Sequence, residues 1–259
     1  MPDAFYEALS ETRFRPTSAT VGPWGPTLSH GSPPAALLLR AIERAFPRDD
    51  ARVARIAYDF FGPVPVAELE IATEMVRPGA RIELTRARLS SGGKTVMTAS
   101  AWRIAVAPAR VPEVRDARAV PALPPPQNLP LFVDVPTFGY GEALDWRFVE
   151  GRFDRLGPAT VYARPKVPLV TGETVSPLGR LLLMVDSANG VSAELQPSQF
   201  TFVPVELTVS VSRHPKTEWV GMSARTTIDP DGVGHTRADL FDEAGYIGTA
   251  LQTLFVAPR

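Results

Sequence analysis

The sequence contains 259 residues, enough for one large domain or for two domains of about 100 to 130 residues that each bury a core. Its 27 basic and 28 acidic residues give a net charge of −1 at pH 7, so neither nucleic acid nor an anionic membrane is indicated as a partner. The absence of cysteine excludes disulfides, thiolate nucleophiles and thiolate metal sites. No segment approaches the ~18 apolar residues of a membrane span, and the first residues lack the features of a signal peptide, so we expect a cytoplasmic protein.

The first half of the chain predicts one helix and five strands. Ser32 followed by Pro33 and Pro34 begins the segment SPPAALLLRAIERAF, and this order indicates a helix start because serine caps helices and proline is tolerated in the first turn. The Gly92-Gly93 pair predicts a turn between the last two strands. The strands are expected near residues 13–20, 53–61, 69–76, 81–89 and 94–106.

Residues 108–136 contain eight prolines, which neither a helix nor a central strand accommodates. We interpret this segment as a proline-rich linker between an N-terminal domain (1–107) and a C-terminal domain (137–259). A long surface loop inside one domain is the alternative. The similarity of the sequences on the two sides favours the linker.

The second half repeats the order of elements. A second helix is expected from Ser176 in SPLGRLLLMVDSANGVSAEL, and the segment TRADL at 236–240 corresponds to TRARL at 85–89. One apolar helix and a long antiparallel sheet in each half predict a duplicated α+β fold, in which each sheet wraps around a buried helix. The strands of this half are expected near residues 144–153, 160–166, 201–213, 219–228, 234–241 and 246–256.

Two polar residues of the second half are candidates for catalysis. Asp186 follows the apolar run of the second predicted helix, where a carboxylate is costly unless it is paired or reached by water; a solvent-facing position is the alternative. Gln252 shares the small apolar face of the last strand with Gly248 and Ala250, which directs its amide toward that helix, although a slip of one residue would turn it outward. Ser100 takes the matching position in the first half, so the pair is expected only in the second half.

The remaining polar motifs are less specific. His30, His214 and His235 are too scattered to predict a metal site, and no metal ligands are expected. His30 and Gly31 directly precede the first helix, so their backbone amides could face a ligand; a plain loop is the alternative. The sequence has no GxSxG, GxGxxG, P-loop, HExxH or EF-hand motif, which disfavours serine hydrolases, nucleotide-binding enzymes and zinc hydrolases.

Several segments resemble a known family. They include GPWGPTLSHGSPPAALLLRAIERA in the first half, and RPKVPLVTGETVSPLGRLLLMVDSANGV and DEAGYIGTALQTLFV in the second. Nearly the whole chain outside the proline-rich segment resembles the TesB-like, type II acyl-CoA thioesterases. The resemblance implies a double hotdog fold, with two tandem hotdog domains that each wrap an antiparallel sheet around a central helix, and an acyl-CoA substrate.

The resemblance also implies site residues. In this family a helix Asp and a strand Gln hold the hydrolytic water, and Asp186 and Gln252 match these positions. A hydroxyl residue two positions before an acidic residue completes the set, but Pro204 stands there, two positions before Glu206. Thr208, further along the same strand, is a substitute only if the strand is shifted or bulged.

The proposed chemistry is hydrolysis without a covalent intermediate or a cofactor. Asp186 is expected to act as general base on a water that Gln252 also holds. The amides near Ser176 and Gly179, at the start of the second helix, are expected to stabilise the oxyanion.

Two other functions stay open. A non-catalytic acyl-CoA or lipid-binding protein is suggested by Pro204, and a hydratase or dehydratase is disfavoured because neither His214 nor His235 has a suitable spacing from the acid. Exposed sheet edges suggest a homodimer or a larger homo-oligomer.

Overall fold

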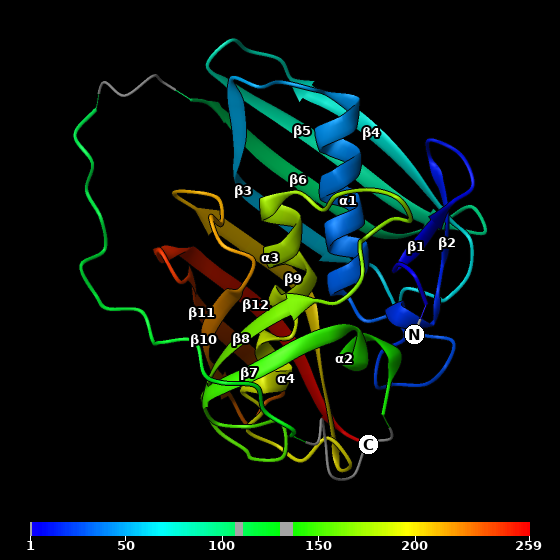
Figure 1. Cartoon of the computed structure of the whole chain (residues 1–259). Coiled ribbons are helices and arrows are strands. Elements are labelled where there is room, and N and C mark those ends of the chain that lie inside the picture. Colours follow the sequence, from blue (N-terminus) through cyan, green and yellow to red (C-terminus); the bar gives the residue numbers. More distant parts are fainter. Residues whose placement is uncertain (1, 107–110, 130–136) are drawn as a thin grey trace.

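The computed structural model describes residues 2–106, 111–129 and 137–259, and these form one antiparallel sheet of twelve strands that curves around two helices (Figure 1). The strand order is β1-β2-β4-β5-β6-β3-β9-β12-β11-β10-β8-β7. The strands of the first half are β1 (Tyr6–Ala8), β2 (Arg13–Pro16), β3 (Ala51–Phe60), β4 (Leu69–Arg77), β5 (Ile82–Ser91) and β6 (Lys94–Ala105). Those of the second half are β7 (Leu144–Glu150), β8 (Ala159–Pro165), β9 (Phe200–Val211), β10 (Val220–Ile228), β11 (Val233–Asp242) and β12 (Gly245–Pro258).

The order of strands shows that the two halves are duplicates. Read outward from the centre, β3, β6, β5, β4, β2 and β1 on one side correspond to β9, β12, β11, β10, β8 and β7 on the other. The halves meet where β3 pairs with β9, with Ala57 opposite Thr208. This is the predicted double hotdog fold, which the structure confirms.

Helices α1 (Ser32–Ala45) and α3 (Pro177–Val185) lie side by side on the concave face of the sheet (Figure 1). Their apolar side chains are buried against alternate residues of the strands, as expected for a sheet with one face on the core. The start of α3 lies near the end of α1, because the Ser176 hydroxyl is 3.4 Å from a carboxylate oxygen of Glu43. The helices therefore run antiparallel, and the end of α3 lies beside the start of α1.

The second helix is shorter than the sequence predicted. α3 ends at Val185, and a separate turn, α4 (Ala188–Val191), follows after Asp186 and Ser187. A further short helix, α2 (Gly139–Ala143), and the strand β1 were not predicted. The predicted strands are present, although β2 and β7 are shorter than expected.

Residues 111–129 of the predicted linker contain no helix or strand, while 108–110 and 130–136 lie outside the described residues. The described part passes along the outer side of the second half (Figure 1). The Tyr162 hydroxyl donates a hydrogen bond to Pro121 O (2.6 Å), and Arg147 donates one to Pro124 O (2.9 Å). Val120 and Leu123 pack on the aromatic cluster of Tyr162, Trp219 and Phe241. The proline segment is therefore anchored on the second half.

The register of the last hairpin turns Gln252 toward the helices. Thr236 of β11 lies opposite Gln252 of β12, and Thr85 of β5 lies opposite Ala101 of β6. Since Thr85 and Thr236 are equivalent in the repeat, Ala101 is the counterpart of Gln252. The assignment of Ser100 is therefore corrected by one residue, and Ser100 points to the outer face because a one-residue shift changes the face of a strand.

Asp242 holds the β11–β12 hairpin in this register. Its fully buried carboxylate accepts hydrogen bonds from the Arg213 guanidinium (3.0 Å to Nη1) and from the backbone amides of Lys216 (2.6 Å) and Ala244 (2.9 Å). Burial alone would raise the pKa of Asp242, but these donors outweigh it and hold the pKa below its usual range.

Replacing Asp242 with alanine removes the acceptor of the half-buried Arg213 guanidinium and of two backbone amides, so we expect Asp242→Ala to lower the free energy of unfolding by about 3 kcal/mol. Urea denaturation at neutral pH measures this change. Asp229→Ala is the matched control, because Asp229 is exposed and, among the described residues, its carboxylate accepts a hydrogen bond only from the amide of Asp231. An Asp242→Ala protein that unfolds at the wild-type urea concentration would show that this carboxylate does not stabilise the hairpin.

Candidate active site

The centre of the site is the break between α3 and α4. In a continuous helix, Leu183 O would accept from Ser187 N, and Asp186 O would accept from the amide four residues on. Here Ser187 N donates to Met184 O instead (2.9 Å), which tightens the last turn and leaves carbonyl groups without helical partners. The break therefore exposes backbone groups that other parts of the protein must satisfy.

The side chain of Gln252 fills this break from the sheet. Its Nε2 donates to the backbone oxygen of Asp186 (3.1 Å) and to the carboxylate oxygen Oδ1 of Asp186 (3.0 Å), and its Oε1 accepts from the amide of Asn189 (3.1 Å). Gln252 is fully buried. Both amide hydrogens and one lone pair of the oxygen are used, so Gln252 fixes the position of Asp186.

The hydroxyl of Tyr140, on α2, forms hydrogen bonds with groups on the other side of the break. It donates to Leu183 O (2.9 Å) and lies 2.7 Å from the Ser187 hydroxyl. A buried tyrosine hydroxyl needs such partners, and here they are the groups that the helix leaves unpaired. The break is thus held by one residue of the sheet and one residue of a short helix.

Asp186 is only 2% exposed. Burial raises the pKa of Asp186 to about 7, although the hydrogen bonds from Gln252 and from the backbone of Gly31 act in the opposite direction. A Cβ atom added to Gly31 would lie 2.5 Å from Oδ2 of Asp186, so only glycine allows this approach of the two chains. The carboxyl group can therefore change its charge near neutral pH.

His30 lies beside the acid, with Nδ1 3.6 Å from Oδ2 of Asp186. Nδ1 accepts a hydrogen bond from the amide of Ser32 (3.1 Å), which places the proton of the neutral ring on Nε2. Burial lowers the pKa of His30 to about 3. Because burial disfavours the charged form of both groups, the contact is not an ion pair near neutral pH.

The His30 ring has a fixed orientation. It stacks on Tyr140 with ring centres 3.8 Å apart and planes 7° from parallel. Among the described residues, none accepts a hydrogen bond from Nε2, and the side chain lines a cavity beside Asp186. A free N–H donor is therefore available at the wall of that cavity.

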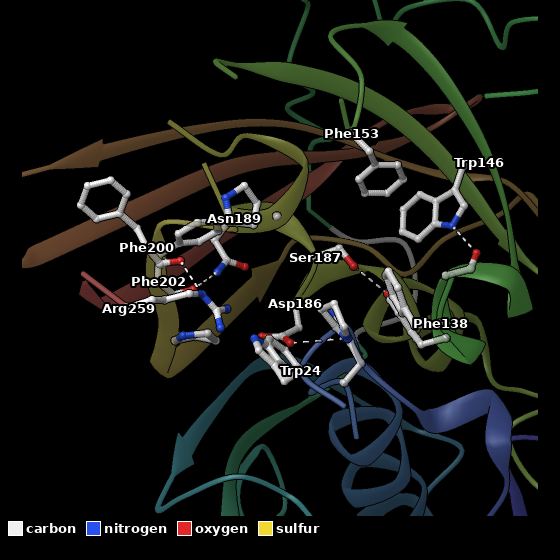
Figure 2. Close-up of a pocket in the computed structure, with 17 residues that line it drawn as sticks. Trp24, Phe138, Trp146, Phe153, Asp186, Ser187, Asn189, Phe200, Phe202 and Arg259 are labelled. Atoms are coloured by element: carbon white, nitrogen blue, oxygen red, sulfur yellow. Dashed lines mark hydrogen bonds and ion pairs between the residues drawn. The ribbon is translucent and has the colours of Figure 1, made fainter. Parts of the chain in front are cut away.

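The cavity beside Asp186 has a volume of about 90 Å³ and is lined mainly by aromatic rings (Figure 2). In Figure 2 Asp186 lies between Phe138, Trp146 and Phe153 on one side and Phe200 and Phe202 on the other. The wall is completed by Trp24 and His30 before α1, Tyr140 on α2, Asn189 on α4, and Pro204 on β9.

The predicted hydroxyl residue does not lie in this site. A bulge at Val205 shifts the pairing of β9 with β12, so that Pro204 lines the cavity while Thr208 lies on the outer face. The Thr208 hydroxyl donates to the carboxylate of Glu206 (3.1 Å). Ser187 and Tyr140 supply the hydroxyl groups of the cavity wall instead.

Ser176 and Gly179 do not lie in this site either. They occupy the first turn of α3, whose nine residues place its start about 13 Å from Asp186. The amide of Gly179 already donates to the Ser176 hydroxyl (3.1 Å), and both residues line a separate pocket with Glu43 and Arg40. Of the predicted substrate-binding residues, the structure places His30 and Gly31 beside Asp186, because α1 and α3 are antiparallel.

The roles of Tyr140, Asn189 and the aromatic wall of the cavity were not predicted from the sequence. The signals available were the polar segment SANG directly after the acid and the aromatic residues of FGYGEALDW. No group of three or more His, Cys, Asp or Glu side chains within the described ranges is close enough to hold a metal ion. In the same ranges, no helix has the length and apolar character needed to cross a membrane.

Comparison with known proteins assigns the family. Residues 112–256 match the Acyl-CoA thioesterase C-terminal domain, which is more than half of the chain, and residues 20–104 match the Acyl-CoA thioesterase N-terminal domain. No curated protein matches the chain closely enough to count as a relative.

Solved structures share the whole fold. A hotdog-fold protein of unknown function from Alicyclobacillus acidocaldarius has a TM-score of 0.75 at 19% identity, with 98% of this chain and 97% of that chain covered. A putative thioesterase II from Thermobifida fusca has a TM-score of 0.75 at 21% identity (98% and 96% covered). A TesB protein from Mycobacterium avium subspecies paratuberculosis has a TM-score of 0.68 at 14% identity (98% and 96% covered). The TM-scores show a common double hotdog fold, and the two domain matches show that the chain belongs to the acyl-CoA thioesterase family and is a thioester hydrolase.

Proposed function

We propose that this chain hydrolyses acyl-CoA thioesters. Asp186 activates the attacking water, and Gln252 holds Asp186 in position. The observation that supports this most directly is the buried contact between the two side chains, beside a cavity that can receive an acyl group. A carboxyl group with a pKa of about 7 is well matched to general base catalysis near neutral pH.

In the proposed reaction, the Asp186 carboxylate takes a proton from the water while the water oxygen forms a bond to the thioester carbonyl carbon. The carbonyl π electrons move to the oxygen, and their return breaks the C–S bond. The CoA sulfur leaves as a thiolate and receives the proton from Asp186, which restores the carboxylate. No cofactor takes part in this sequence.

The carbonyl oxygen is proposed to accept a hydrogen bond from Nε2–H of His30. This donor is neutral, has a fixed ring plane and lines the same cavity as Asp186. At the start of α1, Pro33 and Pro34 have no N–H groups and the Ser32 amide donates to His30. This end of the helix therefore affects the site mainly through His30, through the Gly31 amide and through the positive end of the α1 dipole. Preorganised donors of this kind stabilise the negative charge of a tetrahedral intermediate.

Asp186→Asn removes the general base, so we expect kcat/KM for a good acyl-CoA to fall about 100-fold or more. Release of free thiol from a panel of acyl-CoA substrates measures the change. Asp59→Asn is the control, since Asp59 is an exposed carboxylate on β3 outside the cavity. Unchanged turnover in Asp186→Asn would show that Asp186 is not the general base.

The raised pKa of Asp186 predicts a pH dependence. Below about pH 7 the carboxyl group binds a proton and cannot act as a base. We therefore expect kcat/KM to fall about tenfold per pH unit on the acid side and to level off above about pH 8, as measured by thiol release in buffers of constant ionic strength. A profile that is flat through neutral pH would contradict the proposed role.

Gln252→Leu removes the donor that stabilises the carboxylate form of Asp186, so its pKa should rise further. We expect kcat to fall and the acid limb of the pH profile to move to higher pH. Thr253→Val is the matched control, because Thr253 is the next residue on β12, is exposed and bonds Glu206 on the outer face. An unshifted limb in Gln252→Leu would show that Gln252 does not act through Asp186.

A homodimer or larger homo-oligomer and a cytoplasmic location stay predictions. Association of copies is supported by the apolar side chains of Val233, Leu251 and Phe255, which are exposed on the outer face of β11 and β12.

A further inference from the structure

The wall of the cavity beside Asp186 has an unusual composition for an acyl site. Among the residues that the structure describes, the 17 that line this cavity include no leucine, isoleucine, valine or methionine, whereas the hydrophobic core is built largely from leucine, alanine and valine. Rings and prolines replace the flexible side chains that adapt to an alkyl chain. The surface offered to an acyl group is therefore flat and aromatic.

The rings also hold one another in place. Trp146 meets Phe153 edge to face, with centres 5.1 Å apart and planes at 84°, and it meets Tyr140 at 6.3 Å and 71°. The indole N–H of Trp146 donates to Gly141 O (3.0 Å). Edge-to-face and offset pairs are the arrangements that aromatic rings prefer, and a ring entering this array can form further pairs of the same kind.

The size of the cavity limits the acyl group. The cavity of about 90 Å³ is small, so it can receive a compact acyl group but not a whole CoA thioester. The pantetheine and nucleotide of CoA are much larger and must lie outside. The cavity is thus left for the acyl group, and its small size favours a compact acyl group over a long alkyl chain.

We propose that the preferred substrate is the CoA thioester of a short acid with a single aromatic ring, about the size of a phenylacetyl group. This inference rests on the proposed function, since it takes Asp186 as the point at which the thioester carbonyl lies. The ring enters the array between Trp146 and Phe202, and its carbonyl faces Asp186 and His30.

The decisive comparison is phenylacetyl-CoA with octanoyl-CoA, because their acyl groups have the same number of carbons and differ in having a ring or a chain. Each aromatic pair adds a factor of about 2 to 13 beyond the burial of apolar area. We expect kcat/KM for phenylacetyl-CoA to exceed that for octanoyl-CoA about tenfold, and palmitoyl-CoA to give no measurable thiol release. Equal or faster hydrolysis of octanoyl-CoA, or efficient hydrolysis of palmitoyl-CoA, would overturn the proposal.

Two variants on opposite walls test whether the rings cause the preference. Trp146→Leu and Phe202→Leu should each lower the ratio of the two kcat/KM values by about two- to tenfold, since each removes an aromatic partner and leaves an apolar one. Phe255→Leu is the control, because Phe255 is exposed on the outer face of β12, away from the cavity. Ratios that stay at the wild-type value in both cavity variants would overturn the assignment of the ring array.

The failure of this inference can be told apart from failure of the proposed function. If octanoyl-CoA is the better substrate and Asp186→Asn abolishes its hydrolysis, the function stands and the preference for rings is wrong. If no thioester is hydrolysed, the function fails, and the preference is then decided by calorimetric binding of the same two thioesters to Asp186→Asn. Tighter binding of phenylacetyl-CoA supports the ring site, and equal binding refutes it.

Discussion

The site depends on one interaction, the insertion of the Gln252 amide into the gap between α3 and α4. A helix that stops inside a protein leaves carbonyl and amide groups that are costly to bury without partners. Gln252 supplies a donor for the Asp186 carbonyl and an acceptor for the Asn189 amide, and the same donor reaches the Asp186 carboxylate. One side chain thus satisfies the backbone groups at the break and orients the Asp186 carboxyl group.

The duplication shows what happens without this residue. Ala101 takes the place of Gln252 in the first half, and counting from Ser32 and Ser176 places the buried Ile42 where the second half has Asp186. With no polar group from the sheet and an isoleucine at the position of the acid, α1 continues without a break to Ala45. The first half has instead kept another role, since its loop and helix start bring His30 and Gly31 to the acid of the second half.

The sequence was sufficient to predict most of the helices and strands and the contact between Asp186 and Gln252. The proline and serine starts, the alternation along strands and the repeat predicted the two helices and most strands, and the period of two on β12 turned Gln252 inward. The face of Thr208 was wrongly predicted because the bulge at Val205 changes the phase of β9; the available signal was Pro204, since a central strand accommodates proline at a bulge. Ser176 and Gly179 were misplaced relative to the acid because the antiparallel order of α1 and α3 is a property of the assembled sheet, as is the position of Tyr140.

The pairing of β3 with β9 has a consequence for the two halves as separate pieces. These strands lie in the middle of the sheet, so in each half alone β3 or β9 would become an unpaired edge strand. Each isolated piece would present a long row of unpaired backbone groups and one uncovered helix face, the features that lead to aggregation of edge strands. The backbone hydrogen bonds between β3 and β9 therefore make each half depend on the other for stability, and this dependence would remain even if the proline-rich segment between them were cut.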